Sequence, residues 1–173
     1  MNNALRSARP IEKIFSRPGR PFFLFAAVLF IIAFIAWGTA NRDVLVVRDS
    51  KTGHTLEIGP ISEGETFELH FMHSVDHLPV QDFFVYRNEG LVLDQTRCIS
   101  FGAGLGYAGQ GKLKGENGWN IIDNMNRQVG TLPLRVGTIA NHRIIYRGEE
   151  FRLAQYFAPK SLVLIGVEHK WRF

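Results

Sequence analysis

The sequence has 173 residues, which is room for one domain of ordinary size, and it is too apolar for a largely disordered chain. Its formal net charge is +4, but the excess lies within residues 1–20, which hold five basic residues and one acidic residue, whereas residues 41–173 hold fifteen of each. Nucleic-acid binding needs positive charge clustered on the folded domain, so we expect no nucleic acid among the partners.

The first predicted element is an apolar segment. Residues 22–37 read FFLFAAVLFIIAFIAW, and residues 38–40 extend the uncharged stretch to nineteen residues, enough for a helix across a bilayer. Its basic N-terminal flank favours the cytoplasmic side. We predict a cytoplasmic N-terminus at 1–21, a single-pass signal-anchor at 22–40 in the inner membrane, and an extracytoplasmic domain at 41–173. Small residues at 38–40 leave a cleaved signal peptide as the alternative.

Beyond residue 40 the sequence indicates an all-β domain. Short runs rich in β-branched and aromatic residues alternate with Gly, Pro, Asn and Asp, and no stretch has a helical period. This pattern predicts a single β-sandwich or a partly open barrel. The predicted strands are Val44–Arg48, Thr55–Ile58, Thr66–Val75, Val80–Arg87, Leu91–Phe101, Trp119–Asp123, Leu132–Val136, His142–Tyr146, Glu150–Leu153 and Leu162–Glu168. One helical turn within Asp123–Thr131 is a further possibility.

Residues 102–118 read GAGLGYAGQGKLKGENG and contain two matches to phosphate-binding loops. Such loops need a following helix, whose N-terminus binds the phosphates, and a Ser or Thr after the lysine. Here Lys112 is followed by Leu113, and the next residues do not favour a helix. We therefore expect no nucleotide. The loop is a wide structural hairpin, a flexible rim or lid beside a binding site, or a surface for a partner.

The segment His70–Val80 contains the candidate site residues. Alternation along the predicted strand places His73 on its apolar face, near the end of the strand, and His73, Asp76 and His77 converge only if the chain turns after Val75. Three hypotheses remain open. His73 is a hydrogen-bonded core residue, or it binds a polar ligand together with Ser74, or the pair is catalytic. Catalysis is the weakest, because adjacent side chains diverge in a strand and no third group is apparent.

Cys98 stands alone, which excludes an internal disulfide and cysteine-rich zinc sites. We expect it to pack in a strand as a small hydrophobic residue. No motif with metal-ligand spacing occurs, so we expect neither a metal nor a cofactor.

Three short motifs carry a resemblance to a known family: His73-Ser74-Val75, Pro79-Val80 and Phe101-Gly102-Ala103-Gly104. With the N-terminal apolar segment, they resemble an uncharacterised bacterial family of membrane-anchored β proteins, commonly encoded beside TAXI-type TRAP transporters. The resemblance would cover most of residues 44–168. The family typically has an acidic residue two or three positions after the proline, where this chain has Gln81 and Asp82.

The resemblance implies a non-catalytic accessory protein of a TRAP-type solute transporter, with the membrane and the permease subunits as partners. The alternative is a stand-alone extracytoplasmic module that binds a small organic solute, and an extracytoplasmic hydrolase using Ser74 is the third possibility. The binding residues expected in either of the first two cases are His73, Ser74, Asp76, Pro79, Phe101, Gly102 and Gly104.

Overall fold

The computed structural model describes residues 20–101 and 109–171, with side chains for residues 23–34, 42–101 and 109–170. The chain divides into two compact units, Met1–Thr39 and Ala40–Phe173. One helix, α1 (Arg20–Ala40), precedes the strands.

The twelve side chains of residues 23–34 in α1 are all exposed; Phe30, for example, has a relative exposure of 73%. Among the residues whose side chains are described, no helix is long and apolar enough to cross a membrane.

The second unit is all-β, as predicted. Its described elements are β1 (Asn41–Asp49), β2 (Thr55–Pro60), β3 (Thr66–Met72), β4 (Pro79–Arg87), β5 (Gly90–Cys98), β6 (Lys112–Glu116), β7 (Trp119–Asp123), β8 (Arg127–Gly130), β9 (Leu132–Arg135), β10 (Arg143–Tyr146), β11 (Glu149–Arg152), the short 3-10 helix η1 (Leu153–Gln155) and β12 (Leu162–Trp171).

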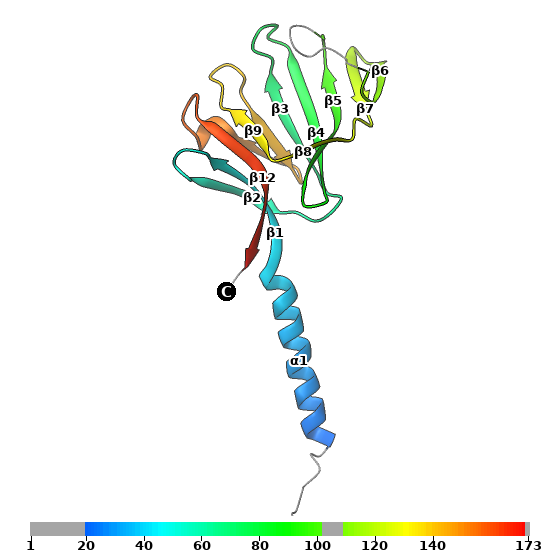
Figure 1. Ribbon diagram of the computed structural model, residues 1–173, viewed down its shortest axis with the longest axis vertical. Coiled ribbons are helices and arrows are strands. Elements are labelled where there is room, and N and C mark those ends of the chain that lie inside the picture. The colour runs from blue at the N-terminus through cyan, green and yellow to red at the C-terminus, as the bar shows by residue number, and fades with distance from the viewer. Residues whose placement is uncertain (1–19, 102–108, 172–173) are drawn as a thin grey trace, which may run out of the picture. The chain divides into compact units, whose positions relative to one another are not determined.

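The strands form two antiparallel sheets. The smaller sheet has the order β2-β1-β12-β9, and the larger has the order β11-β10-β3-β4-β5-β7-β6, with β8 also paired to β5. Figure 1 shows β1 and β12 side by side, although they lie at opposite ends of the domain's sequence, and Asn41 pairs with Trp171. Two sheets of this kind fit the predicted sandwich.

A single hydrophobic cluster draws residues from both sheets and forms the core. Leu45 and Val47 of β1 contribute from the smaller sheet, and Phe67 and Phe84 contribute from the larger one. The rings of Phe67 and Phe84 stack with centroids 5.2 Å apart. Burying side chains of this size stabilises the fold by about 1.5–3 kcal/mol each, so the core is the main source of stability.

A β-bulge in β5 changes which side chains face the core. Phe83 pairs with Gln95 but the next residue, Phe84, pairs with Leu93, so Asp94 is the extra residue. The carbonyl of Asp94 accepts a hydrogen bond from the N–H of Met125 at 2.8 Å instead. Because of this bulge, Leu93 and Thr96 share the inner face, and Arg97 points to the outer face.

A polar tie joins the two sheets at one end of the sandwich. The carboxylate of Asp43 in β1 accepts a hydrogen bond from the Tyr86 hydroxyl of β4 at 2.9 Å and lies 2.9 Å from Nδ1 of His169 in β12. Burial, and secondarily Asp43, raise the pKa of Tyr86 to about 12. The three groups line a hollow of about 480 Å³ with Glu89 and Val167, and their mutual contacts indicate a structural role.

Two differences from the predicted strands matter for the site. The strand predicted as Thr66–Val75 ends at Met72, and Val75 is 63% exposed, so the predicted end of this strand is wrong. The helical turn considered within 123–131 does not form, because residues 127–130 form β8 and pair with β5.

The described part of the glycine-rich segment forms a hairpin. Lys112 begins β6, which pairs with β7 through a turn at Asn117 and Gly118, whose φ values of 50° and 82° are typical of a type I′ turn. At Gly111 a Cβ atom would lie 2.4 Å from the carbonyl oxygen of Asp123, and its φ is 72°, so this position requires glycine. A strand therefore follows where a phosphate-binding loop would need a helix.

Candidate functional site

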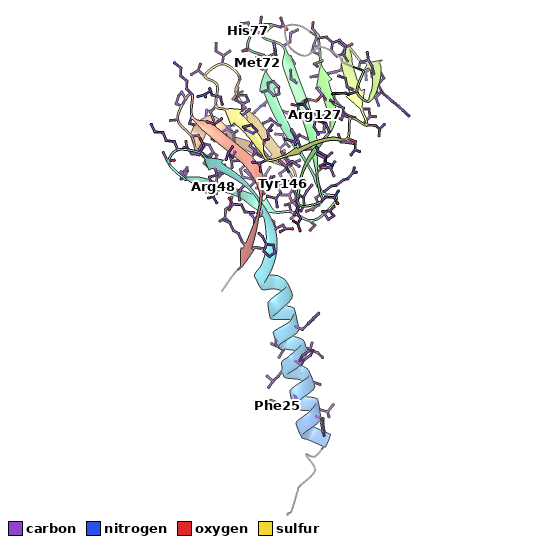
Figure 2. The ribbon with its side chains drawn as sticks, in the orientation of Figure 1. Phe25, Arg48, Met72, His77, Arg127 and Tyr146 are labelled. Carbon is purple, nitrogen blue, oxygen red and sulfur yellow. The ribbon has the colours of Figure 1, made fainter. Side chains whose placement is uncertain are left out.

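The predicted site centres on the turn between β3 and β4. The N–H of His73 donates to the carbonyl of Leu78 at 2.8 Å, and the N–H of His77 donates to the carbonyl of His73 at 3.0 Å. Just before the turn, the N–H of Met72 donates to the carbonyl of Ala140 at 2.7 Å, which fixes the turn to the loop before β10. Figure 2 shows Met72 and His77 at this end of the domain.

His73 and Asp76 meet within this turn, as the sequence suggested they would if the chain turned. Nδ1 of His73 lies 3.3 Å from Oδ2 of Asp76 and 3.4 Å from the Asp76 backbone nitrogen, whose N–H it can accept. Both side chains are largely buried, at 13% and 27% exposure. The chain turns already after Met72, earlier than expected, because the hydrogen bonds of His73 close the turn.

The carboxylate of Asp76 has an unsatisfied atom. Its Oδ2 is buried and has no hydrogen-bond partner among the described residues. A buried carboxylate oxygen without a donor destabilises the fold. A proton on Nδ1 of His73 would supply that donor, while the neutral ring with an unprotonated Nδ1 accepts the backbone N–H instead. The tautomer of the His73 ring therefore decides which of these two hydrogen bonds forms.

The other predicted site residues make no comparable contacts with His73 or Asp76 among the described residues. Ser74 and Pro79 are exposed, and Phe101 is half-buried after the end of β5. Val80 pairs with Cys98, which brings the turn and the end of β5 to the same end of the larger sheet. Gly102 and Gly104 lie outside the described residues.

The geometry gives little support to a nucleophilic serine. Among the described residues, no hydrogen bond joins the hydroxyl of Ser74 to His73, whose Nδ1 contacts Asp76 instead. The exposed side chain of His77 makes no ion pair with His73 or Asp76 among the described residues. No group of three His, Cys, Asp or Glu side chains suited to a metal ion occurs in the described parts of the chain. The arrangement suits a structural or a binding role.

Asp82 is the titratable group that sequence reasoning did not place in the site. It lies on the inner face of β4 opposite Leu69, and its Oδ1 accepts a hydrogen bond from the Thr96 hydroxyl at 2.8 Å. Burial raises the pKa of Asp82 to about 6, although the hydrogen bond and the charge of Arg127 oppose this shift. Arg127 lies beside β5, opposite Leu93 (Figure 2). In the sequence, Asp82 could have been identified as a candidate site residue by its position three residues after Pro79.

Two further residues near this end are structural. Cys98 is 1% exposed and packs as a small hydrophobic residue, as predicted, and burial, followed by the charge of Asp82, raises the pKa of its thiol. His142 is 8% exposed, its ring lies 5.7 Å from that of Phe71, and its Nδ1 is 3.4 Å from the N–H donor of Gly137. Burial lowers the pKa of His142, which favours its neutral form.

Comparison with known proteins identifies a family. A family model described as a domain of unknown function, DUF1850, matches residues 67–153, which is half of the chain. The matched segment runs from β3 to η1 and so contains the larger sheet, the β3–β4 turn and Asp82. No curated protein and no solved structure matches the chain. The chain belongs to the DUF1850 family of domains of unknown function.

Proposed function

We propose that this chain is a membrane-anchored, extracytoplasmic binding domain that assists a TRAP-type solute transporter and is not itself catalytic. The observation that carries the proposal is the pairing of an apolar, uncharged N-terminal segment with an all-β domain whose net charge is zero.

The membrane anchor that we propose is the segment 22–40. The structure describes the side chains of its residues 23–34. All the described side chains are apolar and exposed, so in water this segment would present apolar surface on every side. Such exposure is unfavourable for an isolated helix and would be relieved by lipid. The basic residues before it favour a cytoplasmic N-terminus in the inner membrane, which would place residues 41–173 in the periplasm or outside.

A transporter partner is supported by the resemblance to proteins encoded beside TAXI-type TRAP transporters, which lies in His73-Ser74-Val75, Pro79-Val80 and Phe101-Gly102-Ala103-Gly104. The β3–β4 turn is the contact region that we assign to the permease subunits. It exposes Val75 and Ser74, and the hydrogen bonds of His73 hold its backbone in place.

Site-specific crosslinking tests this assignment. A photo-crosslinking residue would replace Val75 in the full-length chain, and a matched variant would carry it at Lys51, an exposed residue of the β1–β2 turn. We expect permease subunits to be captured in native membranes from position 75 and not from position 51. Capture from neither position, with both chains present at the normal level, would overturn the transporter proposal.

Membrane topology needs a separate test. A Ser50→Cys variant places a thiol at an exposed position of the domain, whereas the native Cys98 is buried and serves as an internal control. A membrane-impermeant maleimide should label Ser50→Cys in intact spheroplasts and leave the wild type unlabelled. Labelling only after lysis would place the domain in the cytoplasm and contradict the proposal.

A second function has its own supporting observation. The outer face of the larger sheet has a pocket of about 310 Å³ lined by charged and aromatic residues, which favours a module that binds a small solute. Such a module could act alone or pass its solute to the transporter.

A further inference from the structure

The pocket on the outer face lies over three adjacent strands, β5, β7 and β6. Arg97 is opposite Ile121, and Ile121 is opposite Lys114, so these three side chains form one row across the sheet. The pocket is lined by Arg97, Lys114, Glu116, Asn117, Trp119 and Ile121. All six belong to the segment that matches the family.

The guanidinium group of Arg97 is fixed by two contacts. It lies over the ring of Phe83, with its Cζ atom 4.5 Å from the ring centroid. Its Nε–H donates to Oε1 of Gln95 at 2.6 Å. The first contact sets the plane of the group and the second sets its rotation in that plane, so the side chain needs little reorganisation to bind.

Gln95 is itself held by the neighbouring strand. Its Nε2 donates to Oδ1 of Asp123 at 3.1 Å, and the other carboxylate oxygen of Asp123 accepts from Nζ of Lys114 at 3.3 Å. The hydrogen bond from Gln95 is the main reason why the pKa of Asp123 lies below its usual value. This chain of contacts also anchors Lys114 at the rim of the same pocket.

The terminal nitrogens of Arg97 are left for a ligand. Neither of them has a hydrogen-bond or ion-pair partner among the described residues, although the side chain is half-buried. A guanidinium group presents these two nitrogens as a fork that matches the two oxygens of a carboxylate. The guanidinium group of Arg97 is half-buried and held by Phe83 and Gln95, while its terminal nitrogens are open, so it forms a preformed anion site.

The other lining residues limit the kind of anion. Lys114 is already paired with Asp123 at 3.3 Å and Glu116 is anionic, so Arg97 is the lining cation whose terminal nitrogens are open to a ligand. One open guanidinium group beside two carboxylates suits a single carboxylate ligand and disfavours a dicarboxylate or a phosphate dianion. Trp119 is half-buried and Ile121 is buried, and they supply an apolar wall for the body of the ligand.

We propose that this pocket binds a small organic monocarboxylate, with its carboxylate on the terminal nitrogens of Arg97 and its apolar part against Trp119. The proposal rests on the solute-binding part of the proposed function and does not depend on contact with the transporter.

The test is calorimetric titration of the full-length protein in detergent with acetate, butyrate and phenylacetate, and with inorganic phosphate and phenylacetamide for comparison. We expect phenylacetate to bind more tightly than acetate, and the amide and phosphate to bind at least about tenfold more weakly than phenylacetate. Tighter binding of phosphate would overturn the ligand class. Absence of binding by all three carboxylates would overturn this site.

Matched variants separate the site from the function. Arg97→Lys keeps the charge and removes the fork, and we expect it to weaken phenylacetate binding about tenfold or more. Arg87→Gln removes an exposed charge at the end of β4 and should leave binding unchanged. If the wild type binds and Arg97→Lys binds equally well, the solute-binding function stands and the Arg97 site is wrong. Equal melting temperatures for the three proteins would confirm that the change is local.

Discussion

The two faces of the β4–β5 pair treat charge in opposite ways. On the inner face, burial raises the pKa of Asp82 to about 6, and its carboxylate accepts a hydrogen bond from the neutral hydroxyl of Thr96. On the outer face, Arg97 follows Thr96 directly, and its guanidinium group is fixed by Phe83 and Gln95 while its terminal nitrogens stay open. The inner charge therefore reduces stability at neutral pH, and the outer charge is held ready for a ligand. Thr96, which contacts the buried carboxylate, and Arg97, which faces the pocket, are adjacent in the sequence.

The sharpest test of this contrast is a pair of adjacent phenylalanines. Phe84 is 2% exposed and stacks on Phe67 in the core, whereas Phe83 lies on the outer face beneath Arg97. Phe84→Ala should lower the free energy of unfolding by about 3–5 kcal/mol. Phe83→Ala should lower it by less than about 2 kcal/mol and weaken carboxylate binding. Urea unfolding and calorimetric titration measure both; equal losses of stability would contradict the assignment of faces.

Asp82→Asn tests the inner charge. The pKa of Asp82 is raised from its ordinary value of 3.8 to about 6, so the folded state binds the proton more tightly than the unfolded state. Stability from this group is therefore present below about pH 4 and is lost as the pH rises to about 6. At about 1.4 kcal/mol per pKa unit, Asp82→Asn should stabilise the protein at pH 7 by up to about 3 kcal/mol.

Unfolding measured at several pH values checks this prediction. The difference in stability between Asp82→Asn and the wild type should grow between about pH 4 and pH 6 and stay constant above that range. Asp94→Asn is a suitable comparison, because it removes a half-buried carboxylate from the adjacent bulge. A difference that is independent of pH would show that Asp82 is not the source.

The polar tie between the sheets should have a smaller effect. Tyr86→Phe removes the hydroxyl that donates to Asp43 at 2.9 Å and keeps the ring in the core. We expect a loss of about 1 kcal/mol in the free energy of unfolding, because Asp43 keeps its contact with His169. Carboxylate binding at the outer pocket should not change. A loss above about 3 kcal/mol would mean that the tie is a principal source of stability.

The smallest effect is expected at Gln95. Gln95→Ala removes the hydrogen bond that orients Arg97 and leaves the charge in place. We expect carboxylate affinity to fall about threefold to tenfold, with a change in stability within about 1 kcal/mol. Gln128→Ala, an exposed position of β8, is the control for general effects. Unchanged affinity in Gln95→Ala would show that Arg97 does not need to be positioned.

Much of the fold follows from local patterns in the sequence. The strand at Trp119–Asp123 was predicted with its observed bounds, because aromatic and β-branched residues stand between clear turn signals there. Strand β6 was missed because Lys, Leu, Gly and Glu have little preference for strands. The Asn117-Gly118 pair was the available signal, since this dipeptide favours a two-residue hairpin turn.

The candidate site was harder to predict, because tertiary contacts decide it. Alternation alone carried the strand of His73 on to Val75, but the hydrogen bond from Met72 to Ala140 and the closed turn that follows belong to long-range packing. Unbroken alternation in β5 would place Arg97 on the same face as Leu91 and Leu93, and only the pairing with β4 reveals the bulge that reverses it. Asp82 could be found as an acidic residue after Pro79, but its raised pKa depends on burial.

The bulge at Asp94 also has an evolutionary consequence. It acts as a change of phase within one strand: before it, odd-numbered residues of β5 face the core, and after it, even-numbered residues do so. Deleting that one residue would interchange Thr96 and Arg97, driving a guanidinium group into the core and turning Cys98 outward. We therefore expect β5 to accept many substitutions during evolution but no change in its length. Homologous domains should differ in this strand by replaced residues and not by insertions or deletions.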